Sequence, residues 1–70
     1  MIPLIYSNVG EENVIKKVSG SQEVRKHLED MGFVPGTIVS LISAFDGNVI
    51  VNVKNVRIAI SKEMAQKIYI

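Results

Sequence analysis

The fold of this chain is decided by residues 19–37, which read Ser19-Gly-Ser-Gln-Glu-Val-Arg-Lys-His-Leu-Glu-Asp-Met-Gly-Phe-Val-Pro-Gly-Thr37. Within this stretch Val24, Leu28 and Met31 recur at helical spacing and form one apolar stripe. Charged side chains occupy the other faces of the same segment. The pattern predicts a short amphipathic helix that packs its stripe onto the rest of the chain.

Both ends of this helix carry local signals. Ser19 and Gln22 have the spacing of a capping box, and Ser21 is an alternative N-cap. Gly32 is a natural left-handed C-terminal cap, because glycine alone takes that conformation without a steric penalty. Pro35-Gly36 then predicts a type II turn, after which a β-strand begins.

The segments on either side of the helix are typical of strands. Residues 12–18 predict a first strand with a bulge or an end near Lys16-Lys17, because its apolar residues do not alternate strictly. Three strands after the helix (38–45, 49–53 and 56–60) form a predicted meander, joined by turns at Asp46-Gly47-Asn48 and Lys54-Asn55. In the last of them Val56, Ile58 and Ile60 are predicted to share a buried face.

The two ends of the chain complete the predicted architecture. Residues 1–6 fit either an edge strand or a turn of helix, and Ser61 predicts the N-cap of a helical turn near the C-terminus. Tyr69-Ile70 can add a closing strand. The sequence therefore predicts a mainly β fold, a small SH3-like, partly open barrel of about five strands, formed by residues 1–70 as a single domain. One short helix follows the first strand.

Composition narrows the possible functions. The 70 residues contain no cysteine, and eight basic and seven acidic residues give a net charge of +1. The charges alternate in sign and do not gather into a basic face, so no nucleic-acid partner is expected. No apolar run approaches the roughly 20 residues of a membrane-spanning helix, and residues 1–6 lack the features of a leader. We expect a cytoplasmic protein without direct membrane insertion.

No group of residues predicts catalysis or metal binding. His27 is the only histidine and lacks a nucleophile or companion ligands at suitable spacing. Glu11-Glu12 and Glu29-Asp30 are adjacent pairs whose side chains point apart. Gly32 and Gly36 serve turns and do not form a phosphate-binding loop. We therefore expect neither an enzyme nor a bound cofactor or metal.

The aromatic residues argue against a peptide-binding SH3 domain. Such a groove is lined by several aromatic side chains, whereas this chain has two tyrosines, two phenylalanines and no tryptophan. Phe33, next to the helix cap, is predicted to be a packing residue and not a stacking platform.

Two motifs resemble the FeoA family. The first comprises Leu28, Met31, Gly32, Phe33, Pro35 and Gly36, and the second comprises Ile58, Ala59, Ile60, Ala65 and Ile68. This resemblance implies an SH3-like barrel that serves as a small cytosolic accessory protein of bacterial ferrous-iron transport. Its implied partner is the cytosolic GTP-binding region of the membrane transporter FeoB. Asn55, where many members have glycine, and the short hairpin at Asp46 depart from the family pattern.

Two other functions remain open at this point. One is a nucleic-acid-binding small barrel of ribosomal or translation-factor type, which the charge balance disfavours. The other is an SH3-like regulatory domain related to iron-dependent repressors, which the lack of a helix-turn-helix motif disfavours. The sequence leaves the oligomeric state open.

A protein that acts by contact needs a surface patch that folding does not require. The turn after the helix and the neighbouring hairpin are the expected place, because loops on a rigid scaffold commonly carry recognition. Val34 is the first candidate, since it lies between Phe33, which should be packed, and Pro35, which is held in the turn. Lys16, Lys17 and Arg57 are the next candidates.

Overall fold

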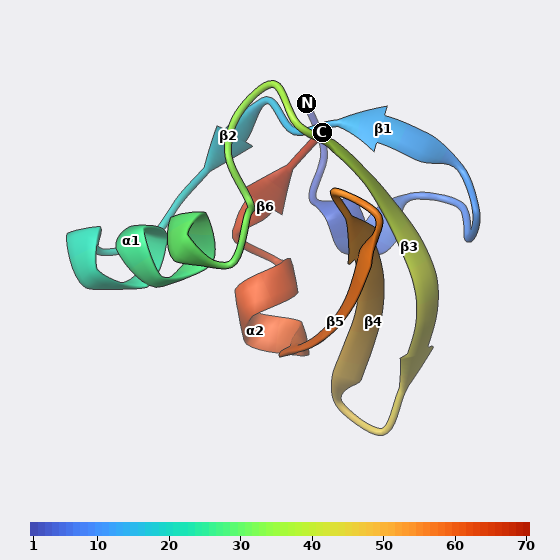
Figure 1. Cartoon of the computed structure of the whole chain (residues 1–70). Helices are drawn as coiled ribbons and strands as arrows, with labels where there is room; N and C mark the ends of the chain where they lie inside the picture. The colour runs from blue at the N-terminus through green and yellow to red at the C-terminus, as the bar shows by residue number, and fades with distance from the viewer.

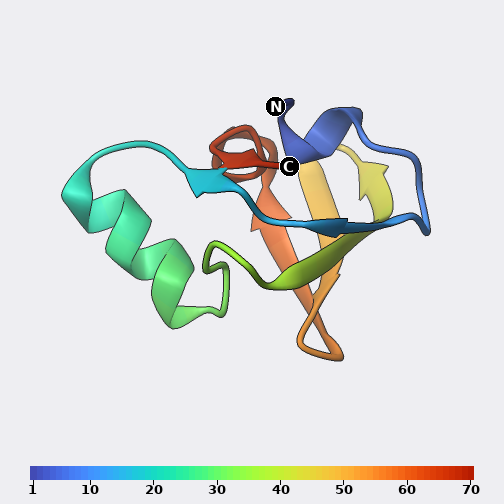
Figure 2. The same cartoon turned by 90° about the horizontal axis from the view of Figure 1, so that it is seen from above.

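The computed structural model describes all of residues 1–70 and is mainly β (Figure 1). Its elements in chain order are a 3₁₀ helix η1 (Leu4–Tyr6), β1 (Glu12–Val14), β2 (Lys17–Val18), α1 (Gln22–Asp30), β3 (Ile38–Phe45), β4 (Asn48–Val53), β5 (Val56–Ser61), α2 (Lys62–Ala65) and β6 (Ile68–Tyr69). The strands form an antiparallel four-stranded sheet in the order β1-β3-β4-β5 and an antiparallel two-stranded sheet of β2 and β6. Figure 2 shows α1 at the end of the molecule away from β1. The predicted SH3-like barrel is confirmed, with six strands where about five were expected.

The start of α1 is set by Ser21. Its hydroxyl accepts a hydrogen bond from the Val24 N–H at 3.2 Å, as an N-cap does. The Ser19 hydroxyl donates instead to the carbonyl oxygen of Lys67, 48 residues further along the chain, at 3.3 Å. Ser21, the alternative cap, is therefore the one used, because a contact with a distant segment engages Ser19.

The helix ends and the chain turns as the glycines predict. Gly32 has a φ of +107°, and the following Phe33 N–H donates to the carbonyl oxygen of Leu28 at 3.0 Å. Gly36 has a φ of +95°, and the Thr37 N–H donates to the carbonyl oxygen of Val34 at 3.0 Å. Proline followed by a positive-φ glycine inside this hydrogen bond is the signature of a type II turn.

The predicted first strand is divided into β1 and β2. Ile15 lies between them, and its side chain is buried in the core. Its N–H donates to the carbonyl oxygen of Thr37 at 2.9 Å, and its carbonyl oxygen accepts from Gly36 N–H at 2.7 Å. The strand is therefore interrupted at Ile15 and Lys16, as predicted near Lys16-Lys17. The backbone of Ile15 is bonded to the turn that follows α1.

Both hairpin turns use left-handed residues. Asp46 and Gly47 have φ values of +52° and +81°, and Lys54 and Asn55 have +52° and +63°. Two successive positive angles match the right-handed twist of the flanking strands. The predicted positions of both turns are confirmed.

Two further predictions need correction or refinement. Val56 was expected to share a buried face with Ile58 and Ile60, but it is 54% exposed because it lies at the end of β5, where no element covers it. Of the two alternatives for residues 1–6, the helical turn is the one formed, as η1. The strand character of the segment is limited to one bridge between Pro3 and Tyr69.

The core lies between the inner face of the four-stranded sheet and the helices. It contains twelve buried apolar residues: Leu4, Ile15, Leu28, Phe33, Val39, Leu41, Val49, Val51, Val53, Ile60, Ala65 and Ile68. Val24 and Met31 pack against it from α1, which confirms the helical stripe. Ser61 caps α2 by accepting from the Met64 N–H at 3.2 Å. None of the helices has the length and apolar character needed to cross a membrane.

Candidate partner-binding surface

The turn after α1 is held rigidly from two sides. The hydrogen bond from the Thr37 N–H to the Val34 carbonyl oxygen closes it. Ile15 donates one hydrogen bond to Thr37 and accepts one from Gly36, which fixes the turn to the segment between β1 and β2. Because Ile15 is buried, this attachment ties the turn to the core. Pro35 and Gly36 at its tip are exposed, and the Val34 side chain is half-buried. Val34 therefore offers only part of its apolar surface to a partner.

Lys16 lies beside this turn. It follows Ile15 directly, and its N–H donates to the carbonyl oxygen of Tyr69 at 2.8 Å, which fixes its backbone. The side chains of Lys16 and Lys17 are both exposed. The fold thus brings Lys16 to the turn that contains Val34, because the residue before it, Ile15, is hydrogen-bonded to Gly36 and Thr37.

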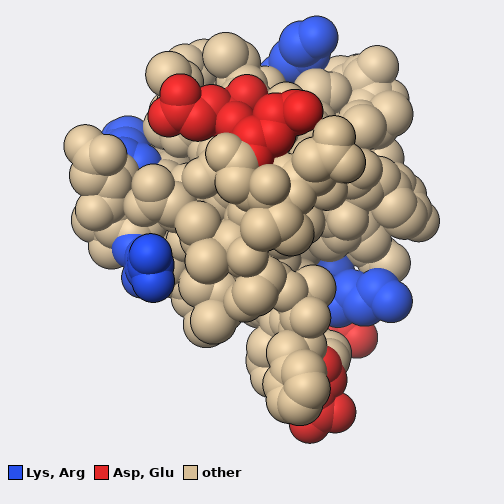
Figure 3. Space-filling view, turned by 90° about the vertical axis from the view of Figure 1, so that its right-hand side faces the viewer, with Lys and Arg blue, Asp and Glu red and all other residues tan.

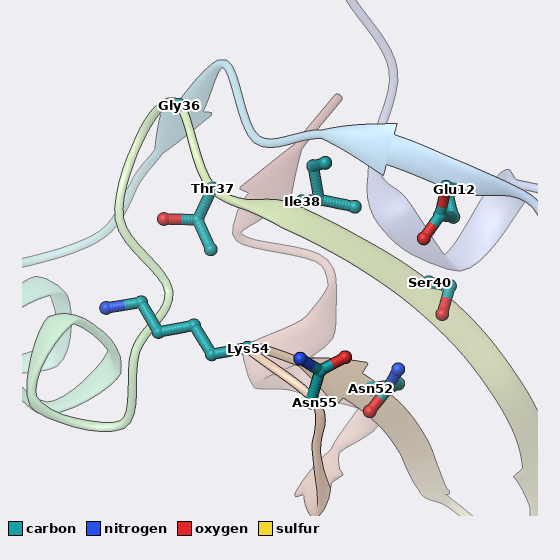
Figure 4. Close-up of a pocket in the computed structure, with 8 residues that line it drawn as sticks. All are labelled: Glu12, Gly36, Thr37, Ile38, Ser40, Asn52, Lys54 and Asn55. Carbon is teal, nitrogen blue, oxygen red and sulfur yellow. The ribbon is translucent and has the colours of Figure 1, made fainter.

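Arg57 belongs to a different part of the surface. It lies on β5, opposite Asn52 of β4, and its side chain is exposed. Between Arg57 and the turn lies a polar groove of about 380 Å³ on the outer side of the four-stranded sheet (Figure 4). It is lined by Glu12, Gly36, Thr37, Ile38, Ser40, Asn52, Lys54 and Asn55.

No motif in the sequence predicts this groove. Its signal was present in the strands, because Ser40 and Asn52 are polar residues that interrupt β-branched runs. Each is flanked by buried apolar residues of the same strand, so the period-2 alternation directs it to the outer face. Their meeting across two strands depends on the register, which the sequence pattern leaves unspecified.

The aromatic side chains divide into buried and exposed ones. Phe33 is fully buried, which confirms its predicted packing role. Phe45, at the end of β3, is 83% exposed, and Tyr6 is exposed as well. These two residues border a second open hollow beside the β3–β4 hairpin.

The titratable groups do not assemble a reactive centre. No three side chains of histidine, aspartate or glutamate gather where they could hold a metal ion. His27 lies exposed on α1. The one ion pair joins Lys26 and Asp30, both well exposed, at 3.8 Å, a kind that contributes little to stability. The side chains at this surface are therefore contact groups carried by a small SH3-like barrel.

Comparison with known proteins identifies the family. The FeoA domain family matches residues 2–70. A curated relative, the putative Fe(2+) transport protein A of Methanocaldococcus jannaschii, is 33% identical over 70 residues, which is 100% of this chain and 85% of the relative. The chain belongs to the FeoA family of ferrous-iron transport accessory proteins.

Solved structures agree with this assignment. The crystal structure of an iron uptake regulatory protein (FeoA) has a TM-score of 0.86 at 26% identity, and the match covers 96% of this chain and 91% of that one. FeoA of Stenotrophomonas maltophilia, described as an SH3 domain protein complexed with zinc, has a TM-score of 0.83 at 19% identity, over 99% and 88% of the two chains. At that identity it supports the fold alone.

The fold is shared with a transcriptional regulator. A manganese-dependent transcriptional repressor has a TM-score of 0.86 at 14% identity, and the match covers 97% of this chain but only 39% of the repressor. The likeness therefore concerns one part of the repressor and the fold only.

Proposed function

We propose that this protein is a cytosolic accessory of ferrous-iron transport that binds the cytosolic GTP-binding region of the transporter FeoB. One observation carries the proposal. The family motif residues Gly32, Pro35 and Gly36 build the turn that is hydrogen-bonded to Ile15. The positive φ angles of the two glycines and the restricted φ of the proline hold the shape of this turn. A turn fixed in this way presents Val34 and Lys16 in a constant arrangement, which lowers the entropy cost of binding.

The chemistry of the turn favours a contact that is apolar at its centre and basic at its edge. Val34 supplies the apolar surface. Lys16 and Lys17 are both exposed, and they directly follow Ile15, whose backbone is bonded to the turn. Neither lysine forms an ion pair within the chain, since the one ion pair is made by α1 residues. They are free to attract acidic groups of the transporter, an effect that acts mainly on the association rate and weakens with salt.

A glutamate at position 34 tests this surface. We expect Val34→Glu to weaken binding to the isolated cytosolic region of FeoB at least tenfold, because the new carboxylate would be desolvated without a partner. Val34 is only half-buried, so the stability change should stay below about 1 kcal/mol. Calorimetric titration measures binding, and a thermal melt measures stability.

The same substitution at an exposed valine elsewhere is the matched control. Val9 is exposed and lies before β1, away from the turn. Val9→Glu should therefore leave binding to FeoB unchanged. If Val34→Glu binds FeoB with parental affinity while folded normally, the contact lies on another surface. Lys16→Glu and Arg57→Glu then decide between the edge beside the turn and the outer face of the sheet.

A further inference from the structure

Four side chains form one row across the outer face of the four-stranded sheet. Glu12 of β1 pairs with Ser40 of β3, Ser40 pairs with Asn52 of β4, and Asn52 pairs with Arg57 of β5. The neighbours of Ser40 and Asn52 along their strands are buried in the core, so the row faces outward. The row is acidic at the β1 edge and basic at the β5 edge.

The groups in this row lack partners within the chain. Ser40 is the one buried polar residue, at 7% exposure, and none of the side-chain hydrogen bonds involves its hydroxyl. Glu12 and Arg57 form no ion pair, because the single ion pair of the protein lies on α1. Figure 4 shows Glu12, Ser40 and Asn52 following one another across β1, β3 and β4, around the polar groove.

Apolar side chains flank the row on the same face. Ile38 precedes Ser40 by two residues and is 53% exposed, and it pairs with Val14, which is also exposed. Ile50 precedes Asn52 by two residues and is exposed too. Figure 3, a view from the β3 side, shows acidic side chains near the top with basic ones close to them, and a broad uncharged surface below them. This arrangement has the composition of a small contact surface.

We propose that this outer face binds a second copy of the same chain. If the second copy is turned over about an axis that runs along the strands between β3 and β4, its β5 lies over β1 of the first. The order of the row then reverses, so Glu12 of each copy meets Arg57 of the other. At the centre, Ser40 of each copy meets Asn52 of the other, so that the amide and the hydroxyl can form a hydrogen bond across the contact. Every polar group of the row is thus paired by a symmetric contact.

The charges select this orientation over the alternative. A two-fold axis along the row itself would place Glu12 over Glu12 and Arg57 over Arg57, which costs free energy. The row spans three strand spacings, roughly 14 Å, and facing sheets pack about 10 Å apart. The aliphatic stem of Lys54 would cover Ile38 of the partner, since long basic side chains bury their stems on apolar surface. The contact is small and partly polar, so the dimer is weak and sensitive to salt.

The symmetry gives a decisive experiment. In Glu12→Arg, two arginines oppose each other at both ends, and in Arg57→Glu two glutamates do. Each variant alone should therefore dimerise roughly tenfold less well than the parent, or more weakly still. When the two variants are mixed, both ends again hold opposite charges, and the mixture should recover the parental degree of association. Sedimentation equilibrium over a range of protein concentrations measures each case, at low and at raised salt.

Matched controls use the same charge changes on α1. Glu23→Arg and Arg25→Glu are exposed and lie on a different element, so neither variant nor their mixture should change the association of the parent. The proposal is overturned if the parent stays monomeric at every concentration in low salt, or if mixing the two variants restores nothing. If the parent is monomeric and Glu12→Arg no longer binds FeoB, the outer face is a contact surface for the transporter and not for a second copy. The self-association itself does not depend on the proposed contact with FeoB.

Discussion

Single residues with unusual backbone angles set the direction of the chain. Gly32 carries the clearest demand, since its φ of +107° ends α1 and sends the chain toward the turn at Pro35. A Cβ at this position would meet the side chains of Lys54 and Val53 no closer than 3.8 Å, which is ordinary contact. The requirement for glycine is therefore conformational and not a matter of space.

This distinction predicts the effect of the smallest substitution. Gly32→Ala should destabilise the protein by roughly 1–2 kcal/mol, because an L-residue is strained at this backbone angle. Gly32→Val should cost more, up to about 3 kcal/mol, since branching at Cβ adds to the strain. Urea denaturation measures both, with Glu29→Ala on the exposed side of the same helix end as the control. If alanine at position 32 leaves the midpoint unchanged, the cap tolerates a Cβ and this account of it is wrong.

At the scale of elements, the two hairpins of the meander use different residues for the same geometry. The β3–β4 turn has Asp46-Gly47, a pair suited to two successive positive φ angles. The β4–β5 turn has Lys54-Asn55 with φ values of +52° and +63°. Asparagine tolerates the left-handed region, whereas lysine is strained there. The backbone angle of Lys54 therefore destabilises the second turn, and the pairing of β4 with β5 offsets this cost.

Relieving this strain should stabilise the protein. We expect Lys54→Asn combined with Asn55→Gly to raise the free energy of unfolding by up to about 1 kcal/mol, because Asn-Gly is the preferred pair for this turn. The reverse change in the other hairpin, Gly47→Ala, should lower the free energy of unfolding by a similar amount, because Gly47 has a φ of +81°. Nothing lies near a Cβ at this position, so the cost is that of the backbone angle alone. Thermal melts measure both variants. Equal stability of the Asn-Gly variant and the parent would show that the strands, and not the turn, determine the hairpin.

At the scale of the whole molecule, the fold separates an apolar interior from surfaces that carry contact groups. One surface is the turn after α1 with Val34 and Lys16, and another is the outer row from Glu12 to Arg57. Neither contains a cluster of acidic or histidine side chains able to hold a metal ion. Membership of the FeoA family connects the protein with ferrous-iron transport, and these two surfaces are the ones we propose for contact with other proteins.

This arrangement predicts how the isolated protein responds to metals. Titration with ferrous iron or zinc should give only weak binding without a defined stoichiometry, because tight sites need three or more ligands in a fixed geometry. Calorimetry under anaerobic conditions measures it, and His27→Ala should give the same curve as the parent. A one-to-one micromolar site that disappears in His27→Ala would contradict the prediction.

Features that depend only on neighbouring residues follow from the amino-acid sequence. The helix with its stripe at Val24, Leu28 and Met31, the glycines at the turns and the strand at 38–45 all follow from steric preferences or apolar spacing within a few positions. The family motif is built from the same local features, so it was readable without coordinates. The position of the turn that carries Val34 therefore follows from the local sequence.

Tertiary structure alone decided which of these features meet. Ser19 lost the capping role to Ser21 because Lys67, far along the chain, engages its hydroxyl. Val56 follows the alternation of a buried face but is exposed, because burial depends on which element covers the end of the sheet. The row from Glu12 to Arg57 exists only through the register of four strands. Register is a sum of weak contacts between segments distant in sequence, and a shift by one residue would turn every side chain in a strand to the other face.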